Sequence, residues 1–157
     1  MATTARDLMQ TRVVTVSPDA TLDSVQRVFV EEGIHGAPVV DPEGRVLGVV
    51  TSMDILRAAA DELDTAPAEP SYFRYDLDLH RFDWDRAPAD LRERIEGATA
   101  ADVMTPELVT VGPEAPVAAI ARALRENAVH RVLVVEDGEL RGIVSTMDLL
   151  GLLESRG

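Results

Sequence analysis

The sequence predicts an α/β fold in which two β-α-β-β-α units pack as a pseudo-symmetric pair, with an aromatic-rich insert between them. Two observations predict this fold. The chain of 157 residues carries one pattern twice, first as RDLMQTRVVTVSPDATL from Arg6 and again as ADVMTPELVTVGPEAPV from Ala101. Hydrophobic residues make up 46% of the chain, which is enough for a packed interior, whereas one unit alone would bury too little to be stable. We therefore expect the two units to pack sheet to sheet.

Each unit begins with a short predicted strand. His35 aligns with His130 at an offset of 95 residues, and the same offset aligns three further pairs, Asp7 with Asp102, Met9 with Met104, and Pro18 with Pro113. Between the methionine and the proline of each copy lies a Val-x-Val stretch. This stretch favours a β-strand, because β-branched side chains suit a pleated surface.

A helix is expected after each proline, because apolar side chains recur there at helical spacing. These side chains are Leu22, Val25, Val28 and Phe29 in the first copy and Val117, Ile120, Ala123 and Leu124 in the second. Thr21 is a candidate N-cap for the first helix, and Pro116 suits the first turn of the second. Gly33 and Asn127 are the predicted C-terminal stops.

Two more strands and a second helix complete each unit. In the first copy we expect strands at 37–40 and 46–50, joined by a turn at 41–44. In the second copy we expect strands at 132–135 and 140–144, joined by the shorter turn Asp137-Gly138. The last helices open with Thr51-Ser52-Met53-Asp54 and Ser145-Thr146-Met147-Asp148.

The copies divide the chain into a first unit at 1–56, an inter-unit insert or linker at 57–100 and a second unit at 101–157. The insert holds five of the six aromatic residues, namely Tyr72, Phe73, Tyr75, Phe82 and Trp84. Their alternation with aspartates predicts strands or extended segments, and residues 90–96 predict a short helix. Two interpretations stay open: a linker whose aromatics pack on the units, or a surface for a partner or a dimer.

Composition excludes several classes of function. The chain has no cysteine, and all 15 basic residues are arginine, so disulfides, thiol nucleophiles, cysteine zinc sites and lysine chemistry are excluded. A net charge of −13 argues against nucleic acid and anionic membranes as partners. No apolar run is long enough to cross a bilayer, and MATTARDLM lacks the apolar core of a signal peptide. We therefore expect a soluble, cytoplasmic protein.

Three motifs, repeated in order, resemble a tandem pair of cystathionine-β-synthase (CBS) domains over residues 6–56 and 101–150. They are DVMTP with VTV downstream, VHRVLVV, and GIVSTMDLL. The resemblance implies ligand clefts between the copies and a stand-alone regulatory module that senses an adenosine-containing ligand, with AMP, ADP or ATP favoured. It implies a homodimer and an unidentified protein target, and no required cofactor. The choice among these nucleotides, NAD, S-adenosylmethionine and a cyclic dinucleotide stays open.

Thr51-x-x-Asp54 and Ser145-x-x-Asp148 are the first candidate binding motifs. A hydroxyl at the N-cap and a carboxylate at the third helical position are typical of a capping box, which would stabilise a helix start. The same groups also suit a nucleotide, because a helix N-terminus attracts phosphate and a carboxylate accepts hydroxyl hydrogens. The resemblance assigns phosphate to the serine or threonine and ribose to the aspartate.

His130-Arg131 is the second candidate motif. Arginine binds phosphate in a bidentate manner, and the pair resembles the His-Arg of the γ subunit of AMP-activated kinase, although it could also be a plain surface pair. The first copy has His35-Gly36 instead, without the arginine. The resemblance thus implies a main cleft lined by Val14, Ile34, His35, Gly36, His130, Arg131, Ser145, Met147 and Asp148. It also implies a weaker second cleft lined by Val109, Val129, Thr51 and Asp54.

Three other kinds of function find less support in the sequence. A ligand-blind dimerisation scaffold is the main alternative, and the absence of arginine at Gly36 favours it. An enzyme is not expected, because no nucleophile stands beside a base in a recognisable motif. Metal binding is not expected, because His35, His80 and His130 lack ligand spacing.

Overall fold

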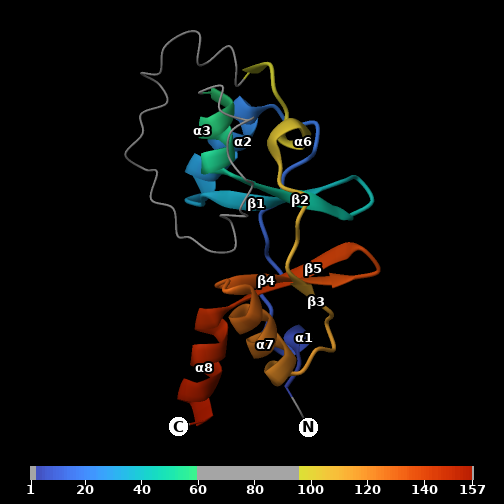
Figure 1. Cartoon of the computed structure of the whole chain (residues 1–157), viewed down its shortest axis with the longest axis vertical. Coiled ribbons are helices and arrows are strands. Elements are labelled where there is room, and N and C mark those ends of the chain that lie inside the picture. Colours follow the sequence, from blue (N-terminus) through green and yellow to red (C-terminus); the bar gives the residue numbers. More distant parts are fainter. Residues whose placement is uncertain (1–2, 60–95, 157) are drawn as a thin grey trace.

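The structure is a computed structural model that describes residues 3–59 and 96–156. The aromatic residues of the insert and the predicted helix at 90–96, except for Glu96, lie outside the described residues. Within the described ranges the chain forms two α/β units, one above the other along the longest axis (Figure 1). The α/β class and the pair of repeated units predicted from the sequence are confirmed.

The two units have the same order of elements. The first contains α2 (Leu22–Glu32), β1 (Gly36–Val40), β2 (Val46–Thr51) and α3 (Ser52–Ala59). The second contains β3 (Thr110–Val111), α7 (Val117–Asn127), β4 (Arg131–Glu136), β5 (Glu139–Ser145) and α8 (Thr146–Arg156). The early strand predicted for each copy is short: β3 pairs in parallel with β4, and in the first unit it is reduced to a single bridge between Val16 and Val39.

The helix ends agree with the predictions at Thr21 and Gly33 and differ at Pro116 and Asn127. Gly33 ends α2 in the left-handed conformation with φ 66°, as expected for a residue without Cβ. Asn127 was predicted as the stop of α7, but it is the last helical residue, and Ala128 takes the left-handed conformation with φ 53°. The side-chain amide of Asn127 donates to the backbone carbonyl of Ala123, 2.8 Å away and one turn earlier in α7. Pro116 precedes the first turn of α7 as its N-cap.

Thr21 occupies the N-cap position of α2, as the sequence predicts. Its hydroxyl does not bond to the helix backbone, however, but lies 3.0 Å from the hydroxyl of Ser24. Thr21 therefore precedes α2 with an extended backbone, and its hydroxyl pairs with that of Ser24.

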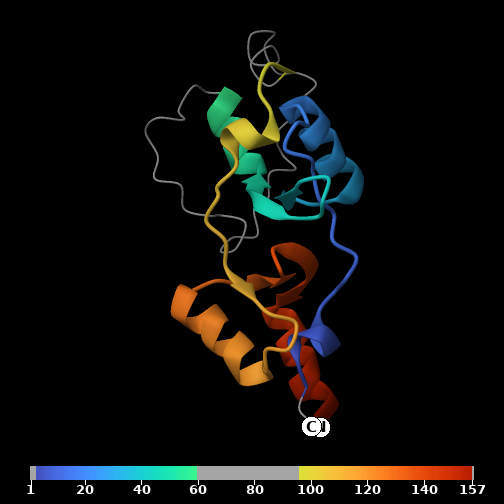
Figure 2. The same cartoon turned by 90° about the vertical axis from the view of Figure 1, so that its right-hand side faces the viewer.

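Two short helices, α1 (Ala5–Leu8) and α6 (Ala100–Val103), exchange places between the units. α1 precedes the first unit in the chain but packs on the second, where Ala5 donates its N–H to the carbonyl of Ala115 at 2.9 Å. α6 packs on the first unit, where Ala100 donates to the carbonyl of Ala20 at 2.8 Å. Figures 1 and 2 show α1 beside the second unit and α6 beside the first. Each hydrophobic core therefore contains residues from both copies.

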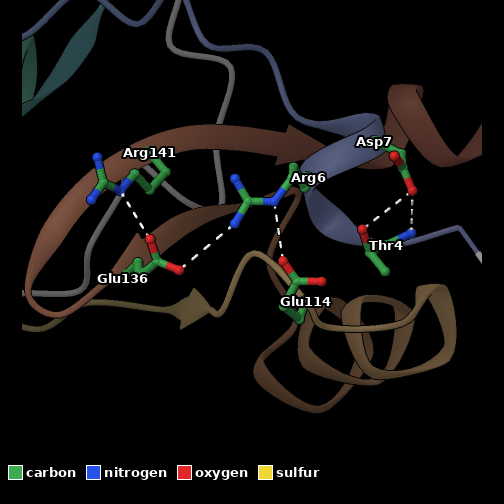
Figure 3. A network of polar contacts seen from close by, with 6 residues as sticks. All are labelled: Thr4, Arg6, Asp7, Glu114, Glu136 and Arg141. Carbon is green, nitrogen blue, oxygen red and sulfur yellow. Dashed lines mark hydrogen bonds and ion pairs between the residues drawn. The ribbon is translucent and has the colours of Figure 1, made fainter.

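Polar contacts add to the attachment of α1 (Figure 3). Arg6 donates to Glu114 at 3.0 Å and lies 3.7 Å from Glu136, which also pairs with Arg141 at 3.4 Å. These side chains are between 38% and 74% exposed, so each pair contributes only about 0–1 kcal/mol. The buried Ala5 and the backbone hydrogen bonds of α1 therefore carry most of the attachment.

The two hairpins meet at their tips. Arg45 forms an antiparallel bridge with Glu139, supported by hydrogen bonds of 3.1 Å from Val46 to Gly138 and from Leu140 to Gly44. Figure 1 shows both tips on the right, while the open ends of the hairpins, where α3 and α8 begin, face the other way. The tertiary pairing thus brings the N-termini of α3 and α8 to the same side of the molecule.

Candidate functional site

The start of α8 carries a complete capping box. Asp148 accepts the backbone N–H of Ser145 at 2.8 Å and its hydroxyl at 3.1 Å, both on Oδ2. In return the N–H of Asp148 donates to the Ser145 hydroxyl oxygen at 3.3 Å. The cap therefore engages one carboxylate oxygen and leaves Oδ1 for another partner.

The strands β4 and β5 place an arginine beside this cap. Arg131, the first residue of β4, lies directly opposite Ser145, the last residue of β5. His130, the residue before Arg131, is held by Thr146. The N–H and the hydroxyl of Thr146 both donate to the carbonyl of His130, at 2.9 and 3.2 Å. Five residues of the predicted main cleft therefore gather at one end of the second unit, namely His130, Arg131, Ser145, Met147 and Asp148.

Gln10 reaches the same place and was not among the sequence-predicted residues. Its Nε2 donates to Oδ1 of Asp148 at 3.2 Å. The two residues are 138 positions apart, so no local pattern links them. The one available signal was a difference between the copies, because Gln10 aligns with Thr105.

The corresponding site in the first unit is closed in. Asp54 accepts the N–H and the hydroxyl of Thr51 at 2.8 and 3.1 Å, and the N–H of Ser52 donates to the carbonyl of His35 at 2.8 Å. Thr51 is 1% exposed and Asp54 is 7% exposed. Oδ1 of Asp54 lies 3.8 Å from a guanidinium nitrogen of Arg57, which leaves it less accessible than Oδ1 of Asp148.

Burial raises the pKa of Asp54 above its ordinary value of 3.8. Hydrogen bonds from the Thr51 backbone and hydroxyl, and the charge of Arg57, act in the opposite direction without cancelling the effect. The two carboxylates of the repeat are thus in different environments, although their capping contacts match within 0.1 Å.

The remaining predicted residues divide between the units. Ile34, His35 and Gly36 lie at the start of β1 in the first unit, partly buried. Val14 lies on the segment between Gln10, which bridges to β5, and Val16, which bridges to β1. This segment therefore runs from the predicted site residues of the second unit to those of the first. Two residues predicted for the second cleft belong to the second unit: Val109 accepts a hydrogen bond from Leu133 at 3.0 Å, and Val129 is a core residue.

Residues 3–59 and 96–156 contain neither a candidate metal site nor a candidate membrane-spanning helix. Within these ranges, no three histidine, aspartate or glutamate side chains come together in a way that could hold a metal ion. His80 lies outside the ranges. None of the described helices combines the length and the apolar character that spanning a bilayer requires.

The protein is a tandem-repeat module. It has two α/β units whose hairpin tips pair, and in each unit a hydroxyl and a carboxylate cap the start of the last helix. The family model described as "CBS domain" matches residues 5–61 and again 100–155. The chain therefore belongs to the CBS domain family and contains a pair of such domains, which confirms the resemblance.

Several curated proteins are similar to the chain. An uncharacterized protein of Methanocaldococcus jannaschii is 24% identical over 150 residues, covering 96% of this chain and 42% of that protein. A homoserine O-acetyltransferase of Methanococcoides burtonii is 24% identical, but the chain spans only 24% of its length. A CBS domain-containing protein of Dictyostelium discoideum is 29% identical, covering 98% of this chain and 92% of that one.

Solved structures show the same architecture. The CBS domain of a CBS domain-containing membrane protein from Sphaerobacter thermophilus is 35% identical with a TM-score of 0.68, covering 96% of this chain and 88% of that one. CBSX2, solved in complex with AMP, is 26% identical with a TM-score of 0.67, covering 98% of each chain.

Proposed function

We propose that the chain is a regulatory CBS pair that senses an adenosine-containing ligand, with AMP, ADP or ATP favoured, between its repeats. The arrangement at the start of α8 carries this proposal. An N-terminus of an 11-residue helix offers backbone N–H groups and a positive dipole end to phosphate. Arg131 stands opposite Ser145 at this terminus as a second anion ligand, and Asp148 offers an acceptor to ribose.

The second unit is the proposed main site. Asp148 is partly exposed. Within the described residues, its Oδ1 accepts a hydrogen bond from the exposed side chain of Gln10. Asp54 is buried beside Arg57, and Gly36 stands where the second copy has Arg131. A charged nucleotide therefore meets an arginine and a more exposed carboxylate at the second-unit site, and the first-unit site is proposed to be weaker.

CBSX2 supports the ligand class, because that relative was solved with AMP and covers nearly the whole chain. We propose no catalytic step and no required cofactor for this chain. The proposal also includes three expectations from the sequence: an energy-sensing role, a cytoplasmic location and an unidentified protein target.

A thermal-shift titration tests the proposal. AMP, ADP, ATP, NAD, S-adenosylmethionine and a cyclic dinucleotide are each added to the full chain up to millimolar concentration. A ligand that binds only the folded state at 100 times its Kd stabilises by about 2.7 kcal/mol, so the Tm of the true ligand rises with concentration. The Asp148→Ala variant is the control and should lose most of this rise. A flat response to every compound would overturn the sensor proposal.

The second candidate is a ligand-blind dimerisation scaffold, which one surface feature favours. Met147, Leu150 and Leu153 of α8 are 72%, 50% and 67% exposed, and their spacing puts them on one side of the helix. A second copy related by a twofold axis would cover this stripe with its own. Sedimentation with and without nucleotide separates the two functions. A scaffold gives a dimer that is unchanged by any ligand and dissociates in Leu150→Glu.

A further inference from the structure

We propose that Gln10 is an internal competitor for the diol of the ligand, occupying the oxygen of Asp148 that a ribose needs. This inference rests on the proposed function, in which Asp148 binds ribose. It assigns a specificity role to a residue of the first repeat in the site of the second. The ligand class that this role distinguishes is a nucleoside with two neighbouring hydroxyl groups.

The acceptor capacity of Asp148 is the first step. A carboxylate has about four lone-pair positions on its two oxygens. Oδ2 already accepts two hydrogens, from the N–H and the hydroxyl of Ser145. Among residues 3–59 and 96–156, Oδ1 accepts one hydrogen, from Gln10 at 3.2 Å. With these partners one position is left, so a diol that donates both hydroxyls to Asp148 must displace the Gln10 amide.

The attachment of Gln10 shows what moves when the amide is displaced. The Gln10 backbone donates to Ile143 at 2.9 Å and accepts from it at 3.0 Å, so the main chain is held on β5. The side chain is exposed, and a released amide finds water as a replacement partner. Displacement therefore requires a change of side-chain rotamer and leaves the connecting segment in place.

The first unit has a different arrangement at the aligned position. Thr105 also pairs with a strand through its backbone, at Val49, but its side chain is short and the residue is 4% exposed. Oδ1 of Asp54 faces Arg57 at 3.8 Å. Removal of the Gln10 amide should therefore affect the second-unit site alone.

Calorimetry on the full chain tests the proposal, with adenosine and 2′-deoxyadenosine as probes. In Gln10→Ala the competing hydrogen bond is gone, and adenosine should bind about fivefold tighter, a typical effect of one net hydrogen bond. 2′-Deoxyadenosine has only one of the two hydroxyls and should change less than about twofold, since the last free position of Oδ1 suffices for it. Thr11→Ala, at the exposed neighbouring residue, is the matched control and should bind both as wild type does.

Two further variants make the result decisive. Gln10→Asn keeps the amide but is one methylene shorter, and it should behave as Gln10→Ala does. In an Asp148→Ala background, Gln10→Ala should have no effect on adenosine. Unchanged or weaker adenosine binding in Gln10→Ala, or an effect that persists without Asp148, overturns the inference alone. Failure of the wild type to bind either adenosine or AMP overturns the proposed function, and this inference with it.

Discussion

Gly142 lies directly against the backbone of Gln10, so closely that a Cβ at Gly142 would stand 2.8 Å from the Gln10 carbonyl oxygen and 2.8 Å from the Met9 sulfur. The repeat has the same relationship on its other side, where a Cβ at Gly48 would stand 2.7 Å from the Thr105 carbonyl oxygen. Each connecting segment crosses a strand where only glycine leaves room, which explains why the two strands carry glycine at matching places.

Gly142→Ala should destabilise the protein by about 1–3 kcal/mol, because the added methyl group overpacks a backbone crossing. The free energy of unfolding from urea titration measures this. Gly112→Ala is the control, since nothing lies within 4 Å of its added Cβ and its φ is not positive. Equal stability of the two variants would show that the crossing can relax at little cost.

Asp148→Ala should weaken nucleotide binding more than Asp54→Ala, because Arg131 stands beside Asp148 and Gly36 replaces this arginine in the other copy.

The stability of the same two variants should respond in the opposite order. Asp54→Ala leaves the buried N–H of Thr51 without its acceptor, which costs about 1–3 kcal/mol, and the part-exposed Ser145 finds water more readily. Calorimetry and urea titration on both variants separate the two effects, and equal losses of affinity would contradict the ranking of the sites.

Arg131→Lys should weaken AMP by about 1–2 kcal/mol, because lysine keeps the charge but lacks the planar fork that holds phosphate. Adenosine, which has no phosphate, should bind nearly as before. The loss should shrink at high salt, since Arg131 is partly exposed. If adenosine loses as much as AMP, Arg131 shapes the fold or the nucleoside pocket instead of binding phosphate.

The raised pKa of Asp54 predicts a pH dependence of stability with a definite sign. Between the ordinary value of 3.8 and the raised value, the folded state binds more protons than the unfolded state. The contribution of Asp54 is therefore full below pH 3.8 and falls as the pH rises through this window. Asp54→Asn keeps an acceptor for Thr51 but does not titrate.

The measurement is the difference in unfolding free energy between wild type and Asp54→Asn across a pH series. The other carboxylates are common to both proteins and cancel in the difference. Wild type should lose stability relative to the variant as the pH rises through the window. A difference that stays flat or changes in the opposite sense would show that burial does not dominate at Asp54.

Much of the fold followed from local patterns. The hairpin strands and the helices after each proline were predictable within one or two residues, because hydrophobic periodicity and turn residues act over short distances. The pairing of Ser145 with Asp148 was predictable for the same reason, since the two are three positions apart at a helix start. The stop at Ala128 was missed because the choice between neighbouring residues depends on helix-end contacts such as that of Asn127 with Ala123.

The sequence by itself determined that two matching α/β units exist, and that each carries a hydroxyl and a carboxylate at the start of its last helix. Only the tertiary structure decided that α1 and α6 exchange units, that Asp54 is buried while Asp148 is accessible, and that Gln10 reaches Asp148. The physical reason is distance along the chain. Local periodicity is independent of the rest of the protein, whereas burial and a contact across 138 residues depend on where two connecting segments cross two strands.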